Sequence, residues 1–571
     1  MKTLRQFAHS VTASRLPMST PPPVRIVTPE QQSSFLPPET ALPSGAVGAV
    51  PENIAAPAPM QAKPQRIPSL KAGVKLTDDQ KRFSEFIEKN KGVGISASPV
   101  GSGKTLSMLA ATINLRSKGK AGKAIVLVPA GLRTNFETEG VKKFTNAKVG
   151  IIGTKDEIAS NPKMDVSKMG DKDFYVVSYD MFKQNPKAYL KATGADTVIA
   201  DEMHRAKDPS TELARTIREI RPHIKNFVGA TATPAMNDPF EAVSLINAIS
   251  KKKMSPAQFQ KEFYERKADG FMDWLFGLFG HEKHGPVTGF KKPGELGKFV
   301  GAAYHFSEPQ VKDTPRKKVD VVRVPMTEKQ TNIYKAILSK QLTAVEKNIL
   351  EKSEMVPEKV LQRIINKTMA ARQLSNNVGY PLGEINVEQT PKALSMIIDA
   401  SNEIKNNPKA QIIMFSNFID HGTDVLESAL QKSKIPYARF TGKDPKSARD
   451  QAVMDYNAGK IKVILISGAG SEGLNLPNTT MVQTMDAQYN PARITQTEGR
   501  GIRRGGLSYL PQEKREVRVK RYVSVPSDNS MSIDEKIYDI AAKKAEFTKQ
   551  FQDIVMKWQA QQQKKKGSKR A

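Results

Sequence analysis

The segment SPVGSGKT, residues 98–105, has the composition of a loop that binds phosphate groups. Small residues let backbone N–H groups surround a triphosphate, and the N-terminus of a following helix adds partial positive charge. Lys104 would reach the β- and γ-phosphates, and the Thr105 hydroxyl would bind Mg²⁺. The residues of the backbone cradle would be Gly101, Ser102 and Gly103. The sequence therefore predicts a site for ATP with Mg²⁺.

Two adjacent carboxylates follow a hydrophobic run in DTVIADEMH, residues 196–204. A parallel strand over this run would deliver both side chains to the carboxyl edge of a sheet, where ligands bind. Asp201 would hold Mg²⁺ directly or through water, and Glu202 would orient and deprotonate an attacking water molecule. His204 either relays the state of this site to another one or is a packed histidine. The pair predicts that the bound nucleotide is hydrolysed.

The segment QTEGRGIRRG, residues 496–505, contains three arginines and three glycines. Because arginine is always charged, these side chains require an anionic partner rather than a place in a core. Arg500 and Arg503 lie three positions apart, so that a helical turn would point both guanidinium groups the same way. Arg504 is better described as a basic residue that contacts nucleic acid from a turn.

Basic residues exceed acidic ones over the whole chain, with 88 Lys and Arg against 58 Asp and Glu, a formal net charge of +30. The isoelectric point is near 9.8. This excess predicts a polyanionic partner, with nucleic acid ahead of an anionic membrane surface. No apolar run reaches the roughly 20 residues that span a bilayer, so no membrane segment is expected.

The 571-residue chain contains no cysteine. This excludes disulfides, thiolate zinc sites, cysteine-ligated iron–sulfur clusters and a cysteine nucleophile. It also fits an intracellular protein, of the cytoplasm or the nucleus. His281 and His284 are the only two histidines close together in sequence. They are either ligands of a metal site without an evident third ligand or two solvated side chains on a helix.

The elements that must position these residues are short β-branched strands in two sets. Near-continuous apolar runs separated by helical segments are typical of parallel strands covered on both faces. Two such sets predict an α/β protein with two lobes. The first set comprises residues 124–130, 174–180, 196–202 and 226–232, and the second comprises residues 411–417, 461–468, 481–486 and 517–525.

The composition also divides the chain into regions. Residues 1–70 hold 13 of the 37 prolines and are expected to form a disordered arm. Residues 71–250 and 391–530 are expected to be the first and the second lobe. Residues 251–390 are expected to be helical insertions between them. Within that region the aromatic segment 270–280 either caps a helical insertion or forms a wedge that faces DNA or a partner.

Both ends of the chain are basic. The first 29 residues contain no Asp or Glu, which resembles an organelle-targeting peptide but suits a plain disordered leader equally well. Residues 531–571 are expected to form a C-terminal helix and a basic tail. Ser532 and Glu535 have the spacing of a capping box at the start of that helix. The apolar stripe expected to pack across the lobes consists of Ile533, Ile537, Ile540, Ala541, Phe547, Phe551 and Val555.

Together these motifs resemble those of superfamily 2 helicases and translocases, and in particular of Swi/Snf-type ATPases. G-x-G-K-T followed by D-E-x-H matches the superfamily. GATATPAMND (229–238) is similar to the T-G-T-P-x-x-N segment of the family, and LTDDQKRFSEFI (76–87) to its first motif. The resemblance covers about residues 70 to 555. Its most specific part, residues 468–504, keeps Gly473, Asn475, Asp486, Asn490, Pro491, Gln496, Gly499, Arg500 and Arg503 at the spacing of the family.

The resemblance implies two tandem RecA-like lobes that close on one ATP molecule. Arg500 and Arg503 would be arginine fingers facing phosphates held by the first lobe, with Gly499 and Gly501 allowing close approach of the backbone. Gln80 would read the adenine. The other nucleotide-binding residues would be Gly473 and Gln496, and those that couple hydrolysis to movement would be His204, Thr231, Thr233 and Asn475.

The resemblance also implies that the partner is duplex DNA, gripped through its backbone without separation of the strands. Phosphate contacts are independent of base sequence and sensitive to salt, in keeping with the net charge of +30. The candidate contacts lie beside family motifs and are Arg133, Asn135, Asn417 and Lys443.

Two departures from the family pattern indicate a compact member of viral, phage or mobile-element type. Chromatin-type members have D-E-M-G-L-G-K-T in the phosphate loop, where this chain has SPVGSGKT. Their last motif runs on to a His and a Gly-Gln pair, where this chain has Ile502 and Gly505–Gly506.

Three functions are consistent with these observations. The first is ATP-dependent translocation on double-stranded DNA. The second is a helicase that unwinds DNA or RNA, for which the segment 270–280 would have to act as the wedge. The third is a nucleic-acid-binding scaffold with an inactive ATPase core. This third function is disfavoured because all the expected catalytic residues are present, namely Lys104, Asp201, Glu202, Arg500 and Arg503.

Overall fold

The computed structural model describes residues 67–99, 101–232, 238–250, 253–266, 287–307, 313–354, 356, 358–380, 384–468 and 474–567. The arm expected over residues 1–70 lies outside the described residues except for its last four positions. The segment 270–280, the two histidines at 281 and 284, Thr233 and Gly473 lie outside them as well. By their contacts, all residues from Arg66 to Ala571 belong to one unit.

The first lobe is built on a seven-stranded sheet in which every neighbouring pair of strands is parallel. The strand order is β3-β4-β2-β5-β6-β1-β9. The strands are β1 (Val93–Ala97), β2 (Lys123–Val128), β3 (Val149–Ile151), β4 (Phe174–Ser178), β5 (Ala195–Ala200), β6 (Asn226–Thr231) and β9 (Tyr304–Phe306). All four strands predicted for the first set are present.

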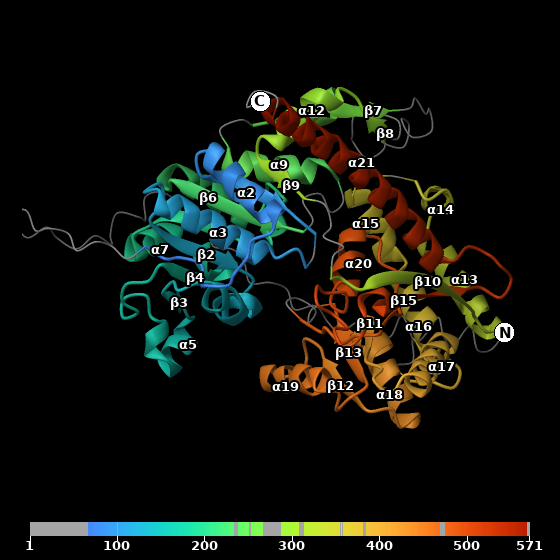
Figure 1. The fold of residues 1–571 in the computed structure, drawn as a ribbon. Helices are drawn as coiled ribbons and strands as arrows, with labels where there is room; N and C mark the ends of the chain where they lie inside the picture. Colours follow the sequence, from blue (N-terminus) through green and yellow to red (C-terminus); the bar gives the residue numbers. More distant parts are fainter. Residues whose placement is uncertain are drawn as a thin grey trace, which may run out of the picture. The chain divides into compact units, whose positions relative to one another are not determined.

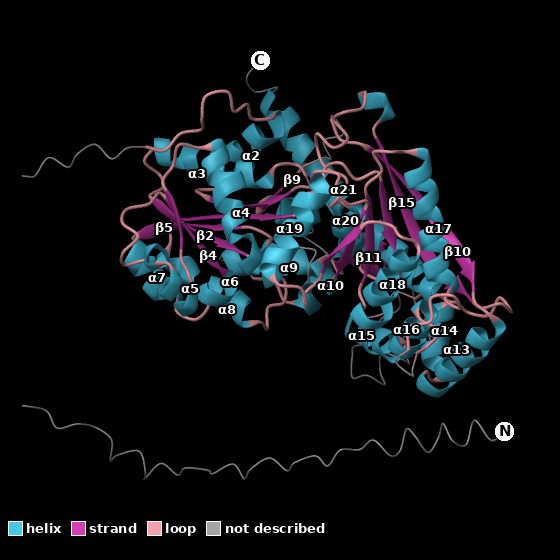
Figure 2. Cartoon of the chain, turned by 90° about the horizontal axis from the view of Figure 1, so that it is seen from below, coloured by secondary structure: helices cyan, strands magenta, loops and turns pink. Residues whose placement is uncertain are grey.

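Helices cover both faces of this sheet. The helices of this lobe are α2 (Asp78–Lys89), α3 (Lys104–Ser117), α4 (Arg133–Asn135), α5 (Lys155–Ser160), α6 (Tyr179–Phe182), α7 (Pro186–Thr193), α8 (Glu212–Ile220) and α9 (Phe240–Ile249), and those that pack on the sheet include α2, α3, α8 and α9. Successive side chains of a strand point to opposite faces. In β2, Val126 therefore packs into the core with α2 and α3, and Leu127 into the core with α8 and α9. Figure 2 shows α2 and α3 on one side of the sheet and α7 and α8 on the other.

The second lobe is built on a six-stranded sheet, again entirely parallel, with the order β10-β15-β14-β11-β13-β12. The strands are β10 (Arg316–Pro325), β11 (Ile412–Ser416), β12 (Tyr437–Phe440), β13 (Val463–Ser467), β14 (Met481–Thr484) and β15 (Glu516–Val525). All four strands predicted for the second set are present. The two sheets confirm the predicted α/β fold with tandem RecA-like lobes.

The faces of the second sheet are covered in the same way. The helices are α17 (Pro391–Asn406), α18 (Asp424–Lys432), α19 (Lys446–Asn457) and α20 (Pro491–Glu498). Met414 of β11 packs into the core with α17 and α18, whereas Phe415 packs into the core with α19. Figure 1 shows β10 in yellow-green and the later strands and helices of this lobe in yellow, orange and red.

The stretch 251–390 differs from the expected helical insertion because it supplies a strand to each sheet. β9 pairs with β1, and β10 pairs with β15 over ten residues. β10, with the sequence RKKVDVVRVP, is a mostly exposed edge strand. Because it contains several charged residues, it lacks the apolar run from which the other strands were predicted. The stretch also contains α10 (Pro256–Phe263), α12 (Pro293–Gly301), α13 (Glu328–Gln341), α14 (Ala344–Glu351), α15 (Glu358–Lys367), α16 (Met369–Asn376) and the antiparallel pair β7 (Tyr264–Arg266) and β8 (Val287–Phe290).

The predicted C-terminal helix is α21 (Ile533–Gly567), which contacts α14 and α12 (Figure 1). The Ser532 hydroxyl accepts a hydrogen bond from the backbone N–H of Glu535 at 3.3 Å. The apolar stripe is buried as expected: Ile537 packs among the helices α13 to α16, and Phe551 packs into the core of the first lobe. No helix among the described residues is both long and apolar enough to cross a membrane.

Candidate functional site

The predicted phosphate loop connects β1 to the N-terminus of α3. Gly101 and Gly103 have φ angles of +83° and +80°, which glycine adopts without the steric cost that a side chain would add. Gly103 is the residue before α3, which begins at Lys104. The helix therefore presents its N-terminal N–H groups at the loop, as an anion site requires.

Polar atoms of the loop are placed to receive a ligand. Lys104 Nζ donates to the carbonyl oxygens of Ser98 and Pro99, at 3.3 and 3.2 Å. Ser102 Oγ is buried and has no hydrogen-bond partner among the residues that the structure describes. A buried hydroxyl without a partner costs free energy, which an accepting ligand oxygen would recover. The loop therefore fits a bound phosphate group.

Two neighbours hold the loop in place. Gln80 Nε2 lies 3.4 Å from the carbonyl oxygen of Gly103, and Gln80 Oε1 accepts from the backbone N–H of Thr77 at 3.0 Å. The Ser98 hydroxyl contacts that of Ser307, which follows β9, at 2.6 Å. Sequence reasoning missed Ser307 because no motif marks it. The structure thus places Gln80 beside the loop, and its contact with adenine stays a prediction.

Asp201 and Glu202 directly follow β5, so they lie at the carboxyl edge of the first sheet as predicted. Glu202 has φ 51° and ψ 47°, a left-handed conformation that is uncommon outside glycine and clusters at functional sites. The Tyr179 hydroxyl donates to the carbonyl oxygen of Asp201 at 2.5 Å. Tyr179, a buried residue that sequence reasoning missed, therefore fixes the turn that carries both carboxylates.

The two carboxyl groups are in different electrostatic environments. Burial raises the pKa of Asp201 to about 7, and the negative charge of Glu202 acts in the same direction. Burial also favours the neutral form of Glu202. Its hydrogen bond with His204 and the positive charges of Lys104 and Arg500 outweigh this effect and lower its pKa to about 2. Carboxyl groups whose pKa values differ in this way can take separate roles in one reaction.

His204 connects the carboxylates to the end of β6. Its Nδ1 lies 3.3 Å from Glu202 Oε2 and 3.4 Å from Thr231 Oγ1. Thr231 is the last residue of β6, and the family segment continues from it into positions outside the described residues. This position favours the relay over a histidine that is merely packed, and the coupling role stays a prediction.

Arg500 and Arg503 do not lie in the predicted helical turn, because α20 ends at Glu498. A Cβ on Gly501 would lie 2.7 Å from the side chain of Thr479, so the close approach that this glycine permits is to Thr479. Arg503 Nη2 donates to the carbonyl oxygen of Leu474 at 2.9 Å. A loop anchored by these contacts, rather than a helix, directs the two guanidinium groups.

Both guanidinium groups nevertheless act on the site in the first lobe. Burial lowers the pKa of Lys104. The negative charges of Glu202 and Asp201 oppose this shift. The positive charges of Arg503 and Arg500 lower the pKa of Lys104 further. Burial also lowers the pKa of Arg503, and the charge of Glu202 opposes that shift. The phosphate loop, the paired carboxylates and the two arginines therefore form one electrostatic site.

The donor set of this site fits Mg²⁺ held together with a nucleotide. Thr105 and Asp201 are the two side chains that would hold the metal. Within the part of the chain that the structure describes, no three His, Cys, Asp or Glu side chains form a group that could hold a metal ion. Mg²⁺ commonly binds one or two carboxylates together with substrate phosphates and water, so it does not need such a group.

The remaining predicted residues of the second lobe lie apart from these interactions or outside the described residues. Gln496 is half-buried in α20, and Asn475 is exposed. The carbonyl oxygen of Asn475 accepts from Asn457 Nδ2 at 3.2 Å. The roles of Gln496 and Asn475 stay predictions, as do those of Gly473 and Thr233.

The predicted nucleic-acid contacts differ in availability. Arg133 forms two hydrogen bonds with Glu157, at 2.6 and 2.9 Å, and its side chain is only 11% exposed. A phosphate contact by Arg133 would therefore have to break a partly buried pair. Asn135 is exposed, and Lys443 is exposed but lies 2.7 Å from Asp420. Of these residues, Asn135 and Lys443 are better placed for a polyanion than Arg133.

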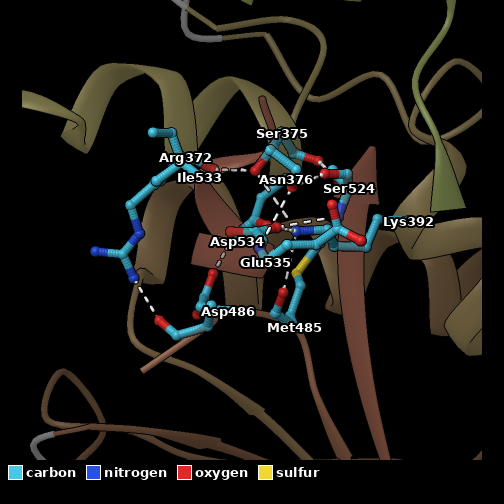
Figure 3. A network of polar contacts seen from close by, with 12 residues as sticks. Arg372, Ser375, Asn376, Lys392, Met485, Asp486, Ser524, Ile533, Asp534 and Glu535 are labelled. Carbon is cyan, nitrogen blue, oxygen red and sulfur yellow. Dashed lines mark hydrogen bonds and ion pairs between the residues drawn. The ribbon is translucent and has the colours of Figure 1, made fainter. Parts of the chain in front are cut away.

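The fourth predicted contact, Asn417, follows β11 and bonds to Asp486 at the carboxyl edge of the second sheet. Figure 3 shows the buried polar network that contains Asp486. Asp486 Oδ2 accepts from the backbone N–H of Asn417 at 2.5 Å and from the Ser416 hydroxyl at 2.7 Å. Asp486 Oδ1 accepts from Asn376 Nδ2. Sequence reasoning placed Asp486 in a family motif, and the structure shows that it organises the end of β11.

Lys392 lies at the centre of this network. Its Nζ donates to Asp534 Oδ2 at 2.6 Å, to Asn376 Oδ1 at 3.1 Å and to the carbonyl oxygen of Met485 at 3.2 Å. The side chains of Lys392 and Asp534 are 1% and 3% exposed. This buried pair joins the start of α17 to the start of α21. A single lysine in a helical pattern gives no sequence signal, so sequence reasoning missed it.

Residues 80–380 match the model of the SNF2-related domain, and residues 392–505 match the helicase conserved C-terminal domain. The first match alone covers more than half of the chain. The chain belongs to the SNF2-related family. This SNF2-related protein is therefore a nucleic-acid-dependent ATPase with a helicase-like motor core.

Several relatives are similar over most of the chain. It is 25% identical over 492 residues to a candidate ATP-dependent RNA helicase of Acanthamoeba polyphaga mimivirus, covering 84% of this chain and 96% of that protein. It is 27% identical over 481 residues to an ISWI chromatin-remodeling complex ATPase of Saccharomyces cerevisiae, covering 80% of this chain and 38% of that protein. The chain thus spans well under half of the length of that ISWI relative.

Among solved structures, the SWI2/SNF2 ATPase core of Sulfolobus solfataricus in complex with dsDNA matches with 19% sequence identity and a TM-score of 0.35. That match covers 79% of this chain and 88% of the other.

Proposed function

We propose that this SNF2-related ATPase moves along duplex DNA, driven by hydrolysis of ATP with Mg²⁺ and without separating the strands. One feature of the structure carries the proposal: Arg500 and Arg503, from the second lobe, lie close enough to Lys104 in the first for their charges to lower its pKa. A site completed by both lobes makes hydrolysis depend on their closure. Cycling between closed and open lobes can then produce movement.

Each group in the site has a role in this scheme. The loop N–H groups and Lys104 bind the β- and γ-phosphates, and Glu202 orients the attacking water molecule. Bound Mg²⁺, held by Thr105 and Asp201, would neutralise charge on the phosphate oxygens. The two guanidinium groups stabilise the charge that develops on the γ-phosphoryl group, a contribution on the order of 10³-fold or more in rate.

The choice of duplex DNA has separate support. A net charge of +30 suits binding to phosphate backbones. The yeast relative is named as a chromatin-remodeling ATPase, and chromatin is packaged duplex DNA. Because the chain covers 38% of that relative, the proposal concerns the motor core and not remodelling as a whole.

A second candidate function is a helicase that separates RNA strands. It is favoured by one finding, the name of the mimivirus relative, which this chain covers almost completely.

ATP turnover measured without nucleic acid, with single strands, with duplex DNA and with RNA separates these functions, with Lys104→Ala as the inactive control. Stimulation by duplex DNA without strand release is the expected result. Stimulation by RNA or single strands with strand release would favour the helicase. Turnover no higher than that of Lys104→Ala would identify an inactive core.

A further inference from the structure

Outside the nucleotide site, α13 and α15 border a surface groove of about 600 Å³. Its lining consists of Gln341, Lys359, Gln362, Arg363, Asn366 and Lys367. Every one of these side chains is a cation or an amide, so each can donate hydrogen bonds and none carries negative charge. Figure 2 shows α13, α14, α15 and α16 grouped beside one another.

The cations of the groove are evenly spaced. Lys359, Arg363 and Lys367 follow one another at intervals of four residues along α15. Because an α-helix rises 1.5 Å per residue, their Cα atoms are about 6 Å apart on one face. Gln362 and Asn366 form a second row beside them, also four residues apart. The result is a linear array of donors rather than a pocket for a single ion.

The opposite face of α15 packs into the core, and this packing keeps the array of donors directed toward the solvent. The other face of α15 is apolar, and four of its residues are buried, Val360, Leu361, Ile364 and Ile365. Lys359, Gln362, Arg363 and Asn366 are all exposed. Rotation of the helix about its axis would expose the apolar face, so the donor rows hold their direction.

Acidic residues on either side of the groove are already engaged. Glu346 accepts from Lys367 at 2.7 and 2.9 Å, and Glu358 accepts from Lys544 at 2.6 Å. The Lys359 end of the array also lies within electrostatic reach of the first lobe. There the pKa of Asp208 is lowered mainly by hydrogen bonds from Ser210 and in smaller part by the charge of Lys359. The array therefore begins near the segment that follows Glu202.

We infer that this groove binds the phosphate backbone of a nucleic-acid strand, as a contact in addition to those next to the family motifs. The inference rests on the proposed function, because it adds a contact to the same nucleic acid. A row of cations with amides alongside suits a row of phosphates and sugars, and such contacts position the strand without reading its bases. Lys359 and Arg363 bind the phosphates, and Gln362 and Asn366 donate to the same strand.

The test replaces both charges in the double variant Lys359→Gln/Arg363→Gln. The control is Lys187→Gln/Lys191→Gln, which removes two exposed lysines four residues apart on α7. Binding of the full chain to a fluorescent DNA duplex is measured at several salt concentrations. Removal of two phosphate contacts should lower the slope of log Kd against log salt by roughly 2, because each contact contributes about 0.9. The Kd at low salt should rise by about 10-fold or more.

The outcomes separate this inference from the proposed function. If the wild-type chain binds duplex DNA and the groove variant matches the control in Kd and slope, the groove is not a contact and the proposed function stands. If the wild-type chain binds neither duplex DNA nor single strands, both are overturned. Thermal unfolding reports whether each double variant folds. If the groove variant does not fold, the single variants Lys359→Gln and Arg363→Gln replace it, and each is expected to lower the slope by about 1.

Discussion

Glu202 carries two features that together define what its carboxylate can do. Its φ of 51° turns the chain out of β5 in a conformation that few residues other than glycine adopt. Its pKa of about 2 reflects the hydrogen bond with His204 and the nearby positive charges, which outweigh the effect of burial. A carboxylate that stays ionised can accept a hydrogen bond from the attacking water molecule. The roles of Glu202 in orienting and deprotonating that water molecule stay predictions.

The two arginines proposed as fingers have a natural control beside them. Arg500→Gln and Arg503→Gln should each lower kcat for nucleic-acid-stimulated ATP hydrolysis by on the order of 10³-fold, because each removes positive charge from the developing γ-phosphoryl group. Arg504→Gln removes the same charge from an exposed neighbour and should leave kcat within about threefold. Steady-state turnover at saturating ATP and saturating nucleic acid is the measurement, so that a weaker nucleic-acid contact in Arg504→Gln does not lower kcat. Equal losses in all three variants would contradict the finger assignment.

Arg133 should prove to be a stabilising residue rather than a nucleic-acid contact. Arg133→Gln breaks the pair with Glu157 and should lower the free energy of unfolding by about 1 kcal/mol, a value kept small because the Glu157 side chain is 38% exposed. Affinity for duplex DNA should stay within about twofold of the wild type. A higher Kd together with a smaller slope of log Kd against log salt would instead identify Arg133 as a phosphate contact.

The pair of Arg133 and Glu157 predicts that the free energy of unfolding depends on pH. The Arg133 guanidinium holds the pKa of Glu157 at about 2, below the value of about 4.3 expected in the unfolded chain. A lowered pKa in the folded state gives stability that is present above about pH 4.3 and lost as the pH falls toward 2. The difference in unfolding free energy between wild type and Arg133→Gln should therefore shrink below about pH 4. Urea unfolding at pH 7 and pH 3.5 checks this, and a constant difference would contradict it.

Among the helices, α12 and α21 meet where glycine leaves room for a large side chain. A Cβ on Gly301 would lie 2.5 Å from the Trp558 ring, whereas one on Gly294 would meet nothing within 4 Å. Gly301→Ala should therefore cost about 1–3 kcal/mol through overpacking. Gly294→Ala should be neutral or stabilising by up to about 1 kcal/mol, because alanine is the better helix former. Thermal unfolding compares them, and an equal effect of both would show that Trp558 moves aside freely.

The buried pair between α17 and α21 gives a larger expected effect. Lys392→Met leaves the Asp534 carboxylate buried without its ion-pair partner, which should cost about 3–5 kcal/mol. The double variant Lys392→Met/Asp534→Asn removes both charges and should recover a substantial part of that loss. Urea unfolding of both variants is the measurement. A single variant within about 1 kcal/mol of the wild type would mean that the network of Figure 3 adapts to the loss.

Strands with a run of apolar residues were predicted from the sequence, whereas β9 and β10, whose places depend on pairing with a distant strand, were not. The eight predicted strands are present because each has a run of buried β-branched or aliphatic residues. β10 was not predicted because its residues are mostly exposed, and β9 was not predicted because three residues are too few to form a recognisable pattern. Their places depend on β15 and β1, which lie far away in the sequence. Long-range pairing of this kind leaves no local signal.

For the site, sequence reasoning found the groups that would touch the nucleotide but not those that hold them. Motif spacing identified Lys104, Asp201, Glu202 and the two arginines. The supporting residues Tyr179 and Ser307 act through a single hydroxyl group each. Such residues are of common types at positions without a pattern, so only the folded chain brings them to the site.

The basic excess of the molecule as a whole predicts binding that is sensitive to salt. With a net charge of +30 and roughly 6–10 phosphate contacts, duplex affinity should fall by about 10³–10⁵-fold between 50 and 200 mM salt. Fluorescence anisotropy with a DNA duplex measures this. ATP affinity over the same range should change far less, because one triphosphate presents fewer phosphate groups than a duplex site. Duplex affinity that is independent of salt would contradict a phosphate-dominated interface.

The pairing of β10 with β15 also bears on how the chain is made. About 190 residues separate the end of β10 from the start of β15, its partner in the sheet. At a synthesis rate of roughly 5–20 residues per second, β10 leaves the ribosome about 10–40 seconds before that partner exists. An unpaired strand is a template for aggregation, and charged side chains are a common protection against it. The lysines and arginines of β10 are therefore expected to limit such pairing during this interval.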